Sequence, residues 1–578
     1  MRQRCGDAPA TRRRPGRLAL SAGGTAAPAR TARRPGHLPP MSHQSRSDEA
    51  KRPLQGLKLV VCGYELEQQE HRGIAVFSKG LLRSLKQAGA EVWLLTQFAP
   101  AMNDMRSRPW LPQPVQRTVF TSRLLDQLNS GSAKPPAESA LQRWLRSLPL
   151  VKWGFVMLEE GQRFKRRLFP RRHIATTQLA QVPTDQLLGS PYQRCERLAY
   201  LRDIDGMLCA DHCFSDSFSL AKRRSSQTLS IDLAGFDGLI STSPLNLQPL
   251  NTRLFVQVVH DLIPLEYGRT RDHLPCFSRR LQATTTARRI YVSQDAEQKY
   301  NAAMLSAGRS SDAVTPTRVL TQCPSLQFPG DALDWEARSS DLKVLSSDQQ
   351  QLHTLKPCQF LLFNSSVVPH KNLLFALRAF MESGIERLGV QFCITGQPQH
   401  DAYSRAVNQL VSQHKNVIFT GYVDEATKRH LYLNALALIS PSLVEGFGIP
   451  VLDAACLGLT ALASPIGSHR EIQAMHDFET HVLLCSTLNT SDWASAMRLV
   501  TLRHQQQLAD LSAKRTQLLL NSIRRERIQR YEALQEQINA AFTAGLCELL
   551  TAGQPGGREW RSVDAPPTTI ALTPPPAD

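Results

Sequence analysis

The chain has 578 residues, of which 42% are hydrophobic and 20% are charged, which is enough apolar material for two sizeable cores. No apolar run approaches the roughly 20 residues that a membrane-spanning helix needs. The 12 cysteines are scattered, and no segment resembles a secretory signal, which favours a reducing cytoplasm. We therefore expect a globular protein of two domains.

The net charge of +18 is concentrated in two segments. Residues 1–40 carry +8 and residues 141–172 carry +7, which leaves only +3 for the rest of the chain. The body of the protein is thus close to neutral. Because the basic residues lie outside the expected cores, the charge argues against a nucleic acid as the partner.

The N-terminal segment, residues 1–55, is rich in Arg, Pro, Ala and Gly. Its few large apolar side chains do not offset the entropy of ordering, so we expect it to be disordered. Met41 is an alternative start to Met1. A transit peptide would also be rich in Arg and poor in acids, but six prolines before Met41 oppose the amphipathic helix that such peptides form. The Pro-rich tail, residues 553–578, is expected to be disordered as well.

The ordered part opens with a strand, a loop and a helix. LKLVVC, from Leu57, predicts a buried strand, residues 71–74 lead into an amphipathic helix, and EVWLLT predicts the next strand. This order is the first βαβ unit of a doubly wound sheet.

The basic segment 141–172 mixes Trp and Phe with Arg and Lys. This composition is typical of a surface that lies on anionic lipid. A solvated basic face over the edge of a core explains it equally well, so both interpretations stay open. Farther along, Cys209 and Cys213 lack a second ligand pair at zinc-site spacing, and we expect buried thiols there rather than a metal site.

A candidate site residue follows the apolar run at residues 254–259. The run predicts a central parallel strand that is covered on both faces. It ends at His260 and Asp261, at the edge where open α/β sheets bind ligands. We favour a site role for His260 over that of a turn residue with satisfied hydrogen bonds. After the next strand, Ser293 is predicted to cap a helix.

The second domain is expected to follow a polar linker with an insertion, residues 321–357. QFLLF, from Gln359, predicts its first strand, and a long helical region begins near Thr501. Lys371 lies where that first strand gives way to a helix, and an ammonium there can bind a phosphate. The alternative is a solvated lysine.

A glycine loop in SPSLVEGFGIPVLDAA leads from an apolar strand into a helix that begins with Ile-Pro. Unpaired amides and the helix dipole at such a start form a site for an anion such as a diphosphate. Gly446 and Gly448 let the backbone approach that anion. Two acids frame the loop: Glu445 precedes it, and Asp453 is expected about two turns into the helix.

The segment EGFGIPVLDA, with GLTALAS after it, resembles the signature of the family-4 retaining glycosyltransferases of GT-B fold (glycosyltransferase group 1). PHKN, which contains Lys371, and HDLIPL, which begins at His260, resemble further motifs of that family. HDLIPL is most similar to bacterial mannosyltransferase-like members that assemble surface polysaccharides such as lipopolysaccharide. The resemblance implies an α/β protein with two Rossmann-like, doubly wound domains that face a central cleft. The acceptor domain would span residues 56–320, and the nucleotide-sugar domain with its C-terminal helices would span residues 358–552.

The resemblance also implies roles for individual residues. Lys371 would bind the nucleotide diphosphate, Glu445 would lie beside the donor sugar, and His260 would lie near the transferred sugar, so these three are the catalytic candidates. Asp453 would bind the ribose hydroxyls, although the family has Glu there, which is longer by roughly 1.5 Å. Many members have Arg where this chain has Ser366, so the diphosphate would depend more on Lys371. The other implied contacts to the nucleotide sugar come from Gly73, Ser366, Val423, Gly446, Phe447, Gly448 and Ile449.

The implied reaction is the transfer of a hexose, with mannose among the candidates, from a nucleoside diphosphate sugar to a hydroxyl of a glycan or a lipid-linked acceptor, with retention. No carboxylate pair at metal-binding spacing stands out, so we expect no cofactor and no metal. The alternative is a catalytically silent partner that binds a sugar nucleotide in a polysaccharide assembly complex. We expect a cytoplasmic protein, with peripheral contact to the inner face of the membrane as an open alternative. The sequence identifies neither the sugar, nor the base, nor the acceptor.

Overall fold

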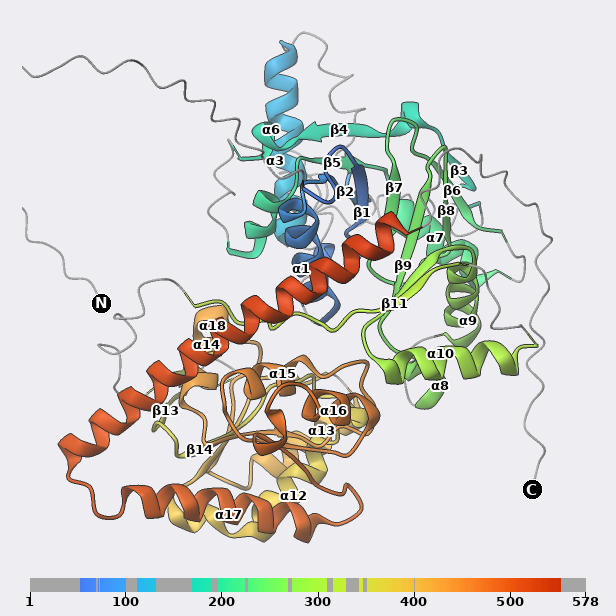
Figure 1. Cartoon of the computed structure of the whole chain (residues 1–578). Helices are drawn as coiled ribbons and strands as arrows, with labels where there is room; N and C mark the ends of the chain where they lie inside the picture. Colours follow the sequence, from blue (N-terminus) through green and yellow to red (C-terminus); the bar gives the residue numbers. More distant parts are fainter. Residues whose placement is uncertain are drawn as a thin grey trace, which may run out of the picture. The chain divides into compact units, whose positions relative to one another are not determined.

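The computed structural model describes most residues between 52 and 552 (Figure 1). The described ranges are 52–68, 71, 73–99, 112–130, 169–188, 196–223, 227–268, 273–308, 315–328, 342–346, 351–399 and 401–552. The tail 553–578 and nearly all of the segments 1–55 and 141–172 lie outside them, so our predictions for these three segments stay predictions.

The first sheet has eight strands in the order β11-β10-β9-β7-β1-β2-β5-β4. All neighbours are parallel except β4, which pairs antiparallel with β5 at one edge. The predicted central strand, β9, lies between β7 and β10 as expected. The strands β4, β5, β7 and β11, which have only three or four residues each, were not predicted from the sequence. The bounds are β1 Lys58–Cys62, β2 Glu91–Thr96, β4 Ala180–Pro183, β5 Gly206–Cys209, β7 Gly238–Ser241, β9 Leu254–Val259, β10 Arg288–Tyr291 and β11 Thr317–Val319.

Helices cover this sheet, and the apolar residues on their buried faces recur at helical spacing. In α1 (Gly73–Gln87), Phe77, Leu81 and Leu85 are buried in the core. Ser293 caps α10 as predicted, because its hydroxyl oxygen accepts a hydrogen bond from the Ala296 amide at 3.0 Å. The other elements are α3 Gln113–Ser130, α6 Thr184–Leu188, α7 Cys213–Lys222, α8 Ile263–Glu266, α9 Leu274–Ala283, α10 Gln294–Ser306, the 3-10 turns η1 Tyr64–Glu67, η2 Thr176–Gln178, η4 Glu196–Asp203 and η5 Thr284–Thr286, and a small parallel sheet of β3 His173–Ile174, β6 Leu229–Asp232 and β8 Leu247–Leu250.

The second sheet has six parallel strands in the order β16-β15-β14-β17-β18-β19. Counted along the chain this is the order 3-2-1-4-5-6 of a Rossmann sheet. The strands are β14 Phe360–Phe363, β15 Gln391–Ile394, β16 Val417–Phe419, β17 Ala437–Ser440, β18 Ala461–Ala463 and β19 Val482–Leu484. The helices are α12 Leu373–Ser383, α13 Ala402–Val411, α14 Glu425–Asn434, α15 Ile449–Cys456, α16 Gly467–Gln473, α17 Thr490–Leu508 and the 3-10 turns η6 Pro369–Lys371, η7 Ile385–Leu388 and η8 Phe478–Thr480.

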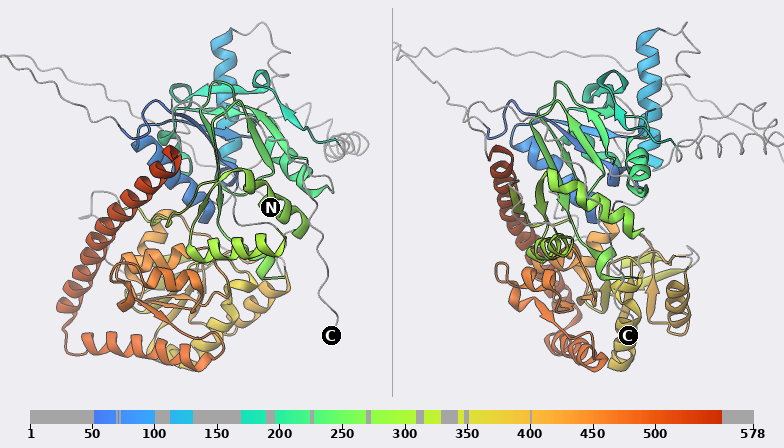
Figure 2. Two further views of the ribbon diagram at one scale, coloured as in Figure 1. Left: turned by 45° about the vertical axis from the view of Figure 1, so that its right-hand side comes forward. Right: turned by 90° about the vertical axis from the view of Figure 1, so that its right-hand side faces the viewer.

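A long C-terminal helix, α18 (Ala513–Thr551), packs against elements of both sheets. It contacts α14 and α15 along one part and α1 and β11 along another, and Figures 1 and 2 show this path in red. Near its end, Arg288 donates a hydrogen bond to the Leu549 carbonyl oxygen at 2.6 Å. Within the predicted linker, β12 (Leu342–Leu345) and β13 (Leu352–Leu355) form an antiparallel pair.

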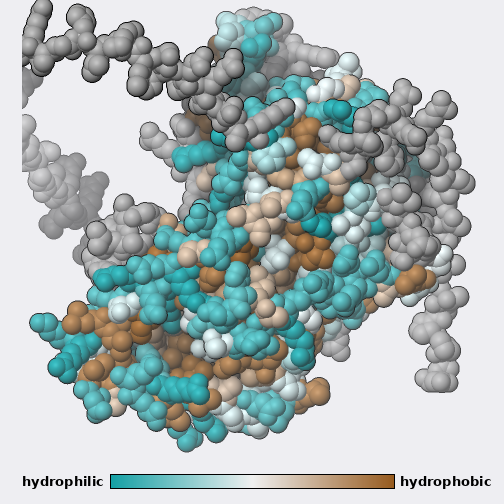
Figure 3. All heavy atoms as spheres, viewed as in Figure 1, coloured by the Kyte–Doolittle hydropathy of each residue, from teal (hydrophilic) through white to brown (hydrophobic). Residues whose placement is uncertain are grey.

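The predicted α/β fold class is confirmed: two Rossmann-like, doubly wound sheets border one cavity, which is the GT-B arrangement. Among the described helices, none is both long and apolar enough to cross a bilayer. The face seen in Figure 3 mixes hydrophilic and hydrophobic residues.

Candidate active site

A cavity of about 830 Å³ lies where strands of both sheets end. Residues that come after β1 and β9 in the chain form its first wall, and residues that come after β14, β15 and β17 form its second wall. In the second sheet the strand order reverses between β14 and β17, which is where open α/β sheets bind ligands. The volume is in the range of small-molecule sites.

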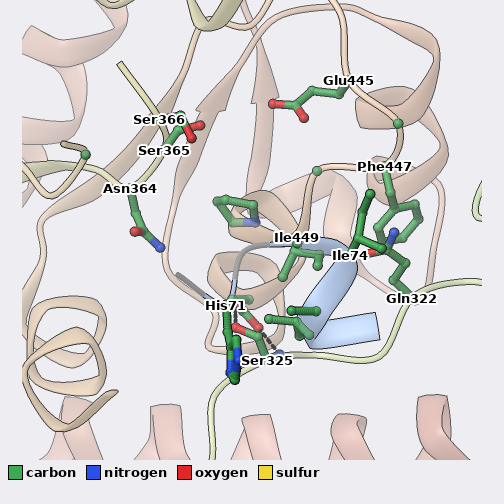
Figure 4. A pocket seen from close by; sticks show the side chains of 18 of the residues that line it. His71, Ile74, Gln322, Ser325, Asn364, Ser365, Ser366, Glu445, Phe447 and Ile449 are labelled. Atoms are coloured by element: carbon green, nitrogen blue, oxygen red, sulfur yellow. Dashed lines mark hydrogen bonds between the residues drawn. The ribbon is translucent and has the colours of Figure 1, made fainter. Parts of the chain in front are cut away.

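All of the predicted site residues line this cavity. The structure therefore brings together residues that are far apart in the sequence, while their roles in binding and catalysis stay predictions. The residues are Gly73, His260, Ser366, Lys371, Val423, Glu445, Gly446, Phe447, Gly448, Ile449 and Asp453. Figure 4 shows Glu445 on one side of the cavity and Asn364, Ser365 and Ser366 on the other.

Lys371 and Glu445 form an ion pair in the cavity. Lys371 Nζ lies 2.5 Å from Glu445 Oε1, and their side chains are 15% and 11% exposed. The Ser442 hydroxyl donates to the same carboxylate oxygen at 2.8 Å. Burial raises the pKa of Glu445, but Lys371, His469 and these hydrogen bonds outweigh it, so the pKa lies below its usual value. An ammonium next to a carboxylate, both partly shielded from water, is thus available to a ligand phosphate.

The glycine loop has two close contacts that leave no room for a side chain. A Cβ on Gly446 would lie 2.2 Å from the carbonyl oxygen of His260. Gly448 has φ of +108° and caps α15, and a Cβ there would lie 3.0 Å from the His469 ring. No side chain caps the start of α15, so the amides at the start of this helix are available to an anion in the cavity.

Contacts from the first sheet hold this loop in place. The Ser293 hydroxyl donates to the Gly446 carbonyl oxygen at 2.7 Å. Glu471 of α16 accepts hydrogen bonds from the first two amides of α10, those of Gln294 and Asp295, at 2.8 and 2.7 Å. A carboxylate at a helix N-terminus is favourable because of the helix dipole. The loop after β17 is therefore fixed against Ser293, which follows β10, and α16 is fixed against the start of α10.

His260 is 5% exposed, and protein groups occupy both of its ring nitrogens. Nε2 lies 2.7 Å from the Thr242 carbonyl oxygen, and Nδ1 lies 3.4 Å from Nε2 of Gln322. Burial lowers the pKa of His260 to about 4, so the ring is neutral at pH 7 and donates from Nε2 to the carbonyl. In this arrangement His260 forms a rigid part of the cavity wall.

Asp453 lines the cavity but is only 1% exposed. It lies just over one turn into α15 rather than two, because residues 445–448 form the loop and the helix begins at Ile449. Its Oδ1 accepts from the Ser325 amide and from the Tyr531 hydroxyl, each at 2.7 Å, and its Oδ2 accepts from the Ser325 hydroxyl. Burial raises its pKa, an effect that Lys428 and these hydrogen bonds reduce. Both carboxylate oxygens thus already have protein partners.

Several charged or polar cavity residues were not predicted from the sequence: Glu65, Gln68, His71, Gln322, Ser325, Asn364, Gln397, Glu425 and Lys428. Glu65 accepts a hydrogen bond from the Thr242 hydroxyl at 3.0 Å, and burial raises its pKa. Asn364 is fixed by Tyr432 and Thr395, each at 2.8 Å. Both residues follow the end of a parallel strand, which is the signal that would have found them.

No group of three or more His, Cys, Asp or Glu side chains among the described residues is arranged to hold a metal ion. Cys209 and Cys213 are both buried, and burial raises the pKa of each thiol.

Residues 347–530 match the family described as Glycosyl transferases group 1. This range contains the second sheet together with Lys371, Glu445 and Asp453. An uncharacterized glycosyltransferase from Methanocaldococcus jannaschii is 31% identical over 115 residues, which is 20% of this chain and 29% of that protein.

Solved structures that resemble the chain include sucrose-phosphate synthase from Thermosynechococcus elongatus, with a TM-score of 0.42 and 15% identity over 86% of this chain and 100% of that one. HepE from Anabaena, in complex with UDP and glucose, gives a TM-score of 0.40 and 12% identity over 85% of this chain and 99% of that one. Similarities of this extent do not indicate a substrate.

Proposed function

We propose that this chain, whose residues 347–530 form a group 1 glycosyl transferase domain, moves a hexose from a nucleoside diphosphate sugar to a hydroxyl of a glycan or a lipid-linked acceptor, with retention. The observation that carries the proposal is the Lys371–Glu445 ion pair, which lies beside the uncapped start of α15 in a cavity bordered by both sheets. The resemblance of HDLIPL to mannosyltransferase-like proteins supports a mannose-type sugar.

Lys371 and the amides at the start of α15 are suited to hold the diphosphate. During transfer the bond between the anomeric carbon and the diphosphate oxygen breaks, and negative charge develops on the leaving diphosphate. Fixed donors aimed at developing charge are usually the largest catalytic contribution. The ammonium of Lys371 is the cation that the family resemblance assigns to the diphosphate, and the Ser366 hydroxyl supplies a donor in place of the missing Arg.

We expect Glu445 to face the sugar once the diphosphate binds Lys371. The carboxylate of Glu445 pairs with Lys371, and its lowered pKa keeps it ionised at neutral pH. A phosphate competes for the same ammonium through stronger, charge-assisted hydrogen bonds. The freed carboxylate is then available to the sugar hydroxyls or to positive charge that develops at the anomeric carbon.

The acceptor would enter along the first wall. Glu65 and His71 line that side, and the raised pKa of Glu65 is suited to hydrogen bonding with a hydroxyl.

Two observations favour the alternative of a silent, sugar-nucleotide-binding partner: Ser366 replaces a cation, and the oxygens of Asp453 are already bonded. We place the protein in the cytoplasm, with peripheral membrane contact through residues 141–172 as part of the proposal.

Two variants test the proposal against the silent alternative. Lys371→Ala and Glu445→Gln should each lower turnover by about 100-fold or more, measured as nucleoside diphosphate released from a nucleotide sugar. Circular dichroism and thermal unfolding should show an intact fold. Lys514→Ala, an exposed lysine at the start of α18, is the matched control. Full activity in either cavity variant would refute the assignment.

A further inference from the structure

The carboxylate of Asp453 is bonded to two parts of the chain that lie far from it in the sequence. Ser325, in the segment after β11, donates to Oδ1 through its amide at 2.7 Å and to Oδ2 through its hydroxyl. Tyr531 of α18 donates to Oδ1 through its hydroxyl, also at 2.7 Å. These protein donors occupy both of the oxygens that would have to accept hydrogen bonds from a ribose.

The carboxylate has little capacity left for a ligand. Its two oxygens offer about four acceptor positions, and the bonds from Ser325 and Tyr531 already occupy three of them. Because Asp453 is 1% exposed, the remaining position is almost closed off from the cavity as well. Asp453 therefore cannot accept from both hydroxyls of a ribose unless a protein donor leaves it.

The two donors are themselves held in place. Tyr531 is 0% exposed, and its hydroxyl oxygen accepts from the Leu326 amide at 2.7 Å. Gln535, one turn farther along α18, donates to the carbonyl oxygens of Pro324 and Leu326 at 3.2 and 2.9 Å. The residues on both sides of Ser325 are thus bonded to α18, and Figure 4 shows Ser325 in the wall of the cavity. A ligand that displaced Ser325 would disturb these bonds too.

Replacing these bonds with bonds to a ribose offers no gain. A buried donor that loses its partner costs free energy, so Ser325 and Tyr531 both oppose displacement. Asp453 is also shorter, by roughly 1.5 Å, than the Glu that the resembling family has here, so it reaches less far past Ser325. The Ser325 hydroxyl does not take its place, because its proton is donated to Asp453 and it offers a ribose a neutral acceptor at most.

We propose that Asp453 ties the second domain to α18 and to the segment after β11, and that the site therefore does not read the 2′-hydroxyl of the nucleotide. The donor class then includes 2′-deoxynucleoside diphosphate sugars, such as dTDP-sugars, beside their ribose counterparts. The inference rests on the proposed function, because it assumes that a nucleotide sugar occupies this cavity. It departs from the role that the family resemblance implies for this position.

Calorimetric titration of the full chain with three matched pairs of nucleotides tests the inference. The pairs are UDP and dUDP, GDP and dGDP, and ADP and dADP, in which the second member lacks only the 2′-hydroxyl. In every pair that binds, we expect the two dissociation constants to differ by less than about 5-fold. A site that is built to bond a hydroxyl rejects the analogue without it by a larger factor.

Asp453→Asn separates the structural bonds from ribose recognition. The Asn amide nitrogen is a donor, so it cannot accept from both Ser325 and Tyr531 as the carboxylate does, and the urea midpoint of unfolding should fall. The affinity ratio within each nucleotide pair should stay as it is in the unmodified chain. Asp510→Asn, at an exposed aspartate after α17, is the matched control and should change neither the midpoint nor the ratio.

The outcomes separate this inference from the proposed function. A preference of about 5-fold or more for the ribonucleotide would overturn the inference while the proposed function stands. Loss of that preference in Asp453→Asn would assign it to Asp453, and its loss in Glu425→Gln would assign it to another carboxylate of the cavity. If none of the six nucleotides binds, the proposed function fails and this inference fails with it. The unmodified chain decides the ratio by itself if a variant does not fold.

Discussion

Replacing Gly446 by alanine perturbs the place where the glycine loop meets the first sheet. The added Cβ would lie 2.2 Å from the His260 carbonyl oxygen and 3.2 Å from the Asp261 Cβ, whereas ordinary contacts begin at 3.4 Å. One backbone segment must therefore move by more than 1 Å. Because both neighbours are held by Ser293, Thr242 and the ends of strands, the loop has no easy direction of relief.

The consequence should be larger for turnover than for stability. Overpacking of this kind costs about 1–3 kcal/mol of unfolding free energy. A misplacement of about 1 Å at a reacting centre lowers turnover by roughly 100-fold. Steady-state release of nucleoside diphosphate and thermal unfolding measure the two effects on one preparation. Nucleotide affinity should change less than turnover. Lys371 lies in the second wall of the cavity and takes no part in the contact between Gly446 and His260.

Gly268→Ala is the matched control, since a Cβ there meets nothing within 4 Å and the residue has no positive φ. It should leave turnover and unfolding unchanged. Wild-type turnover in Gly446→Ala, or an equal loss in Gly268→Ala, would show that the contact between the loop and β9 does not position the reaction.

Two further predictions concern other contacts. Tyr531→Phe removes a buried hydroxyl that donates to Asp453 and accepts from the Leu326 amide, each at 2.7 Å. The free energy of unfolding in urea should fall by about 1–3 kcal/mol, and an unchanged midpoint would contradict the structural role of Asp453. Charge reversal at Arg166 and Arg167 should release the chain from anionic vesicles, and unchanged binding would exclude the membrane proposal. Arg171 is unsuitable for that test, because it already forms an ion pair with Asp216 at 2.8 Å.

The sequence predicted the elements whose signal is local. The apolar run of β9, the cap at Ser293 and the glycine loop before α15 depend on neighbouring residues, and the structure has all three. The placement of Lys371 and Glu445 around one cavity was implied by the resemblance to the glycosyltransferase family, and it agrees with the general rule that ligands bind at the carboxyl ends of parallel strands.

Contacts between residues that lie far apart in the chain could not be predicted from the sequence. The partners of Asp453 are Ser325 and Tyr531, which lie 128 and 78 positions away, and no local pattern joins them. The occupied nitrogens of His260 depend in the same way on Thr242 and Gln322. Such partners decide whether a polar side chain is available to a ligand, so a motif alone overstates the number of available groups.

Short elements were also missed, because too few residues carry their pattern. β11 has three residues, and the antiparallel pair of β12 and β13 lies in a stretch whose polar composition indicated a linker. Glu425 and Lys428 were not predicted to line the cavity, because pairs of opposite charge at this spacing are common on solvated helix surfaces.

The most direct test of the central claim is mass spectrometry of the acceptor after incubation of the full chain with GDP-, UDP-, ADP- and dTDP-sugars and a lipid-linked acceptor. The account predicts a product that is heavier than the acceptor by one hexose, formed by the unmodified chain and lost in Lys371→Ala. A chain that binds a nucleotide sugar and yet forms no such product with any donor in the panel would contradict the claim of transfer.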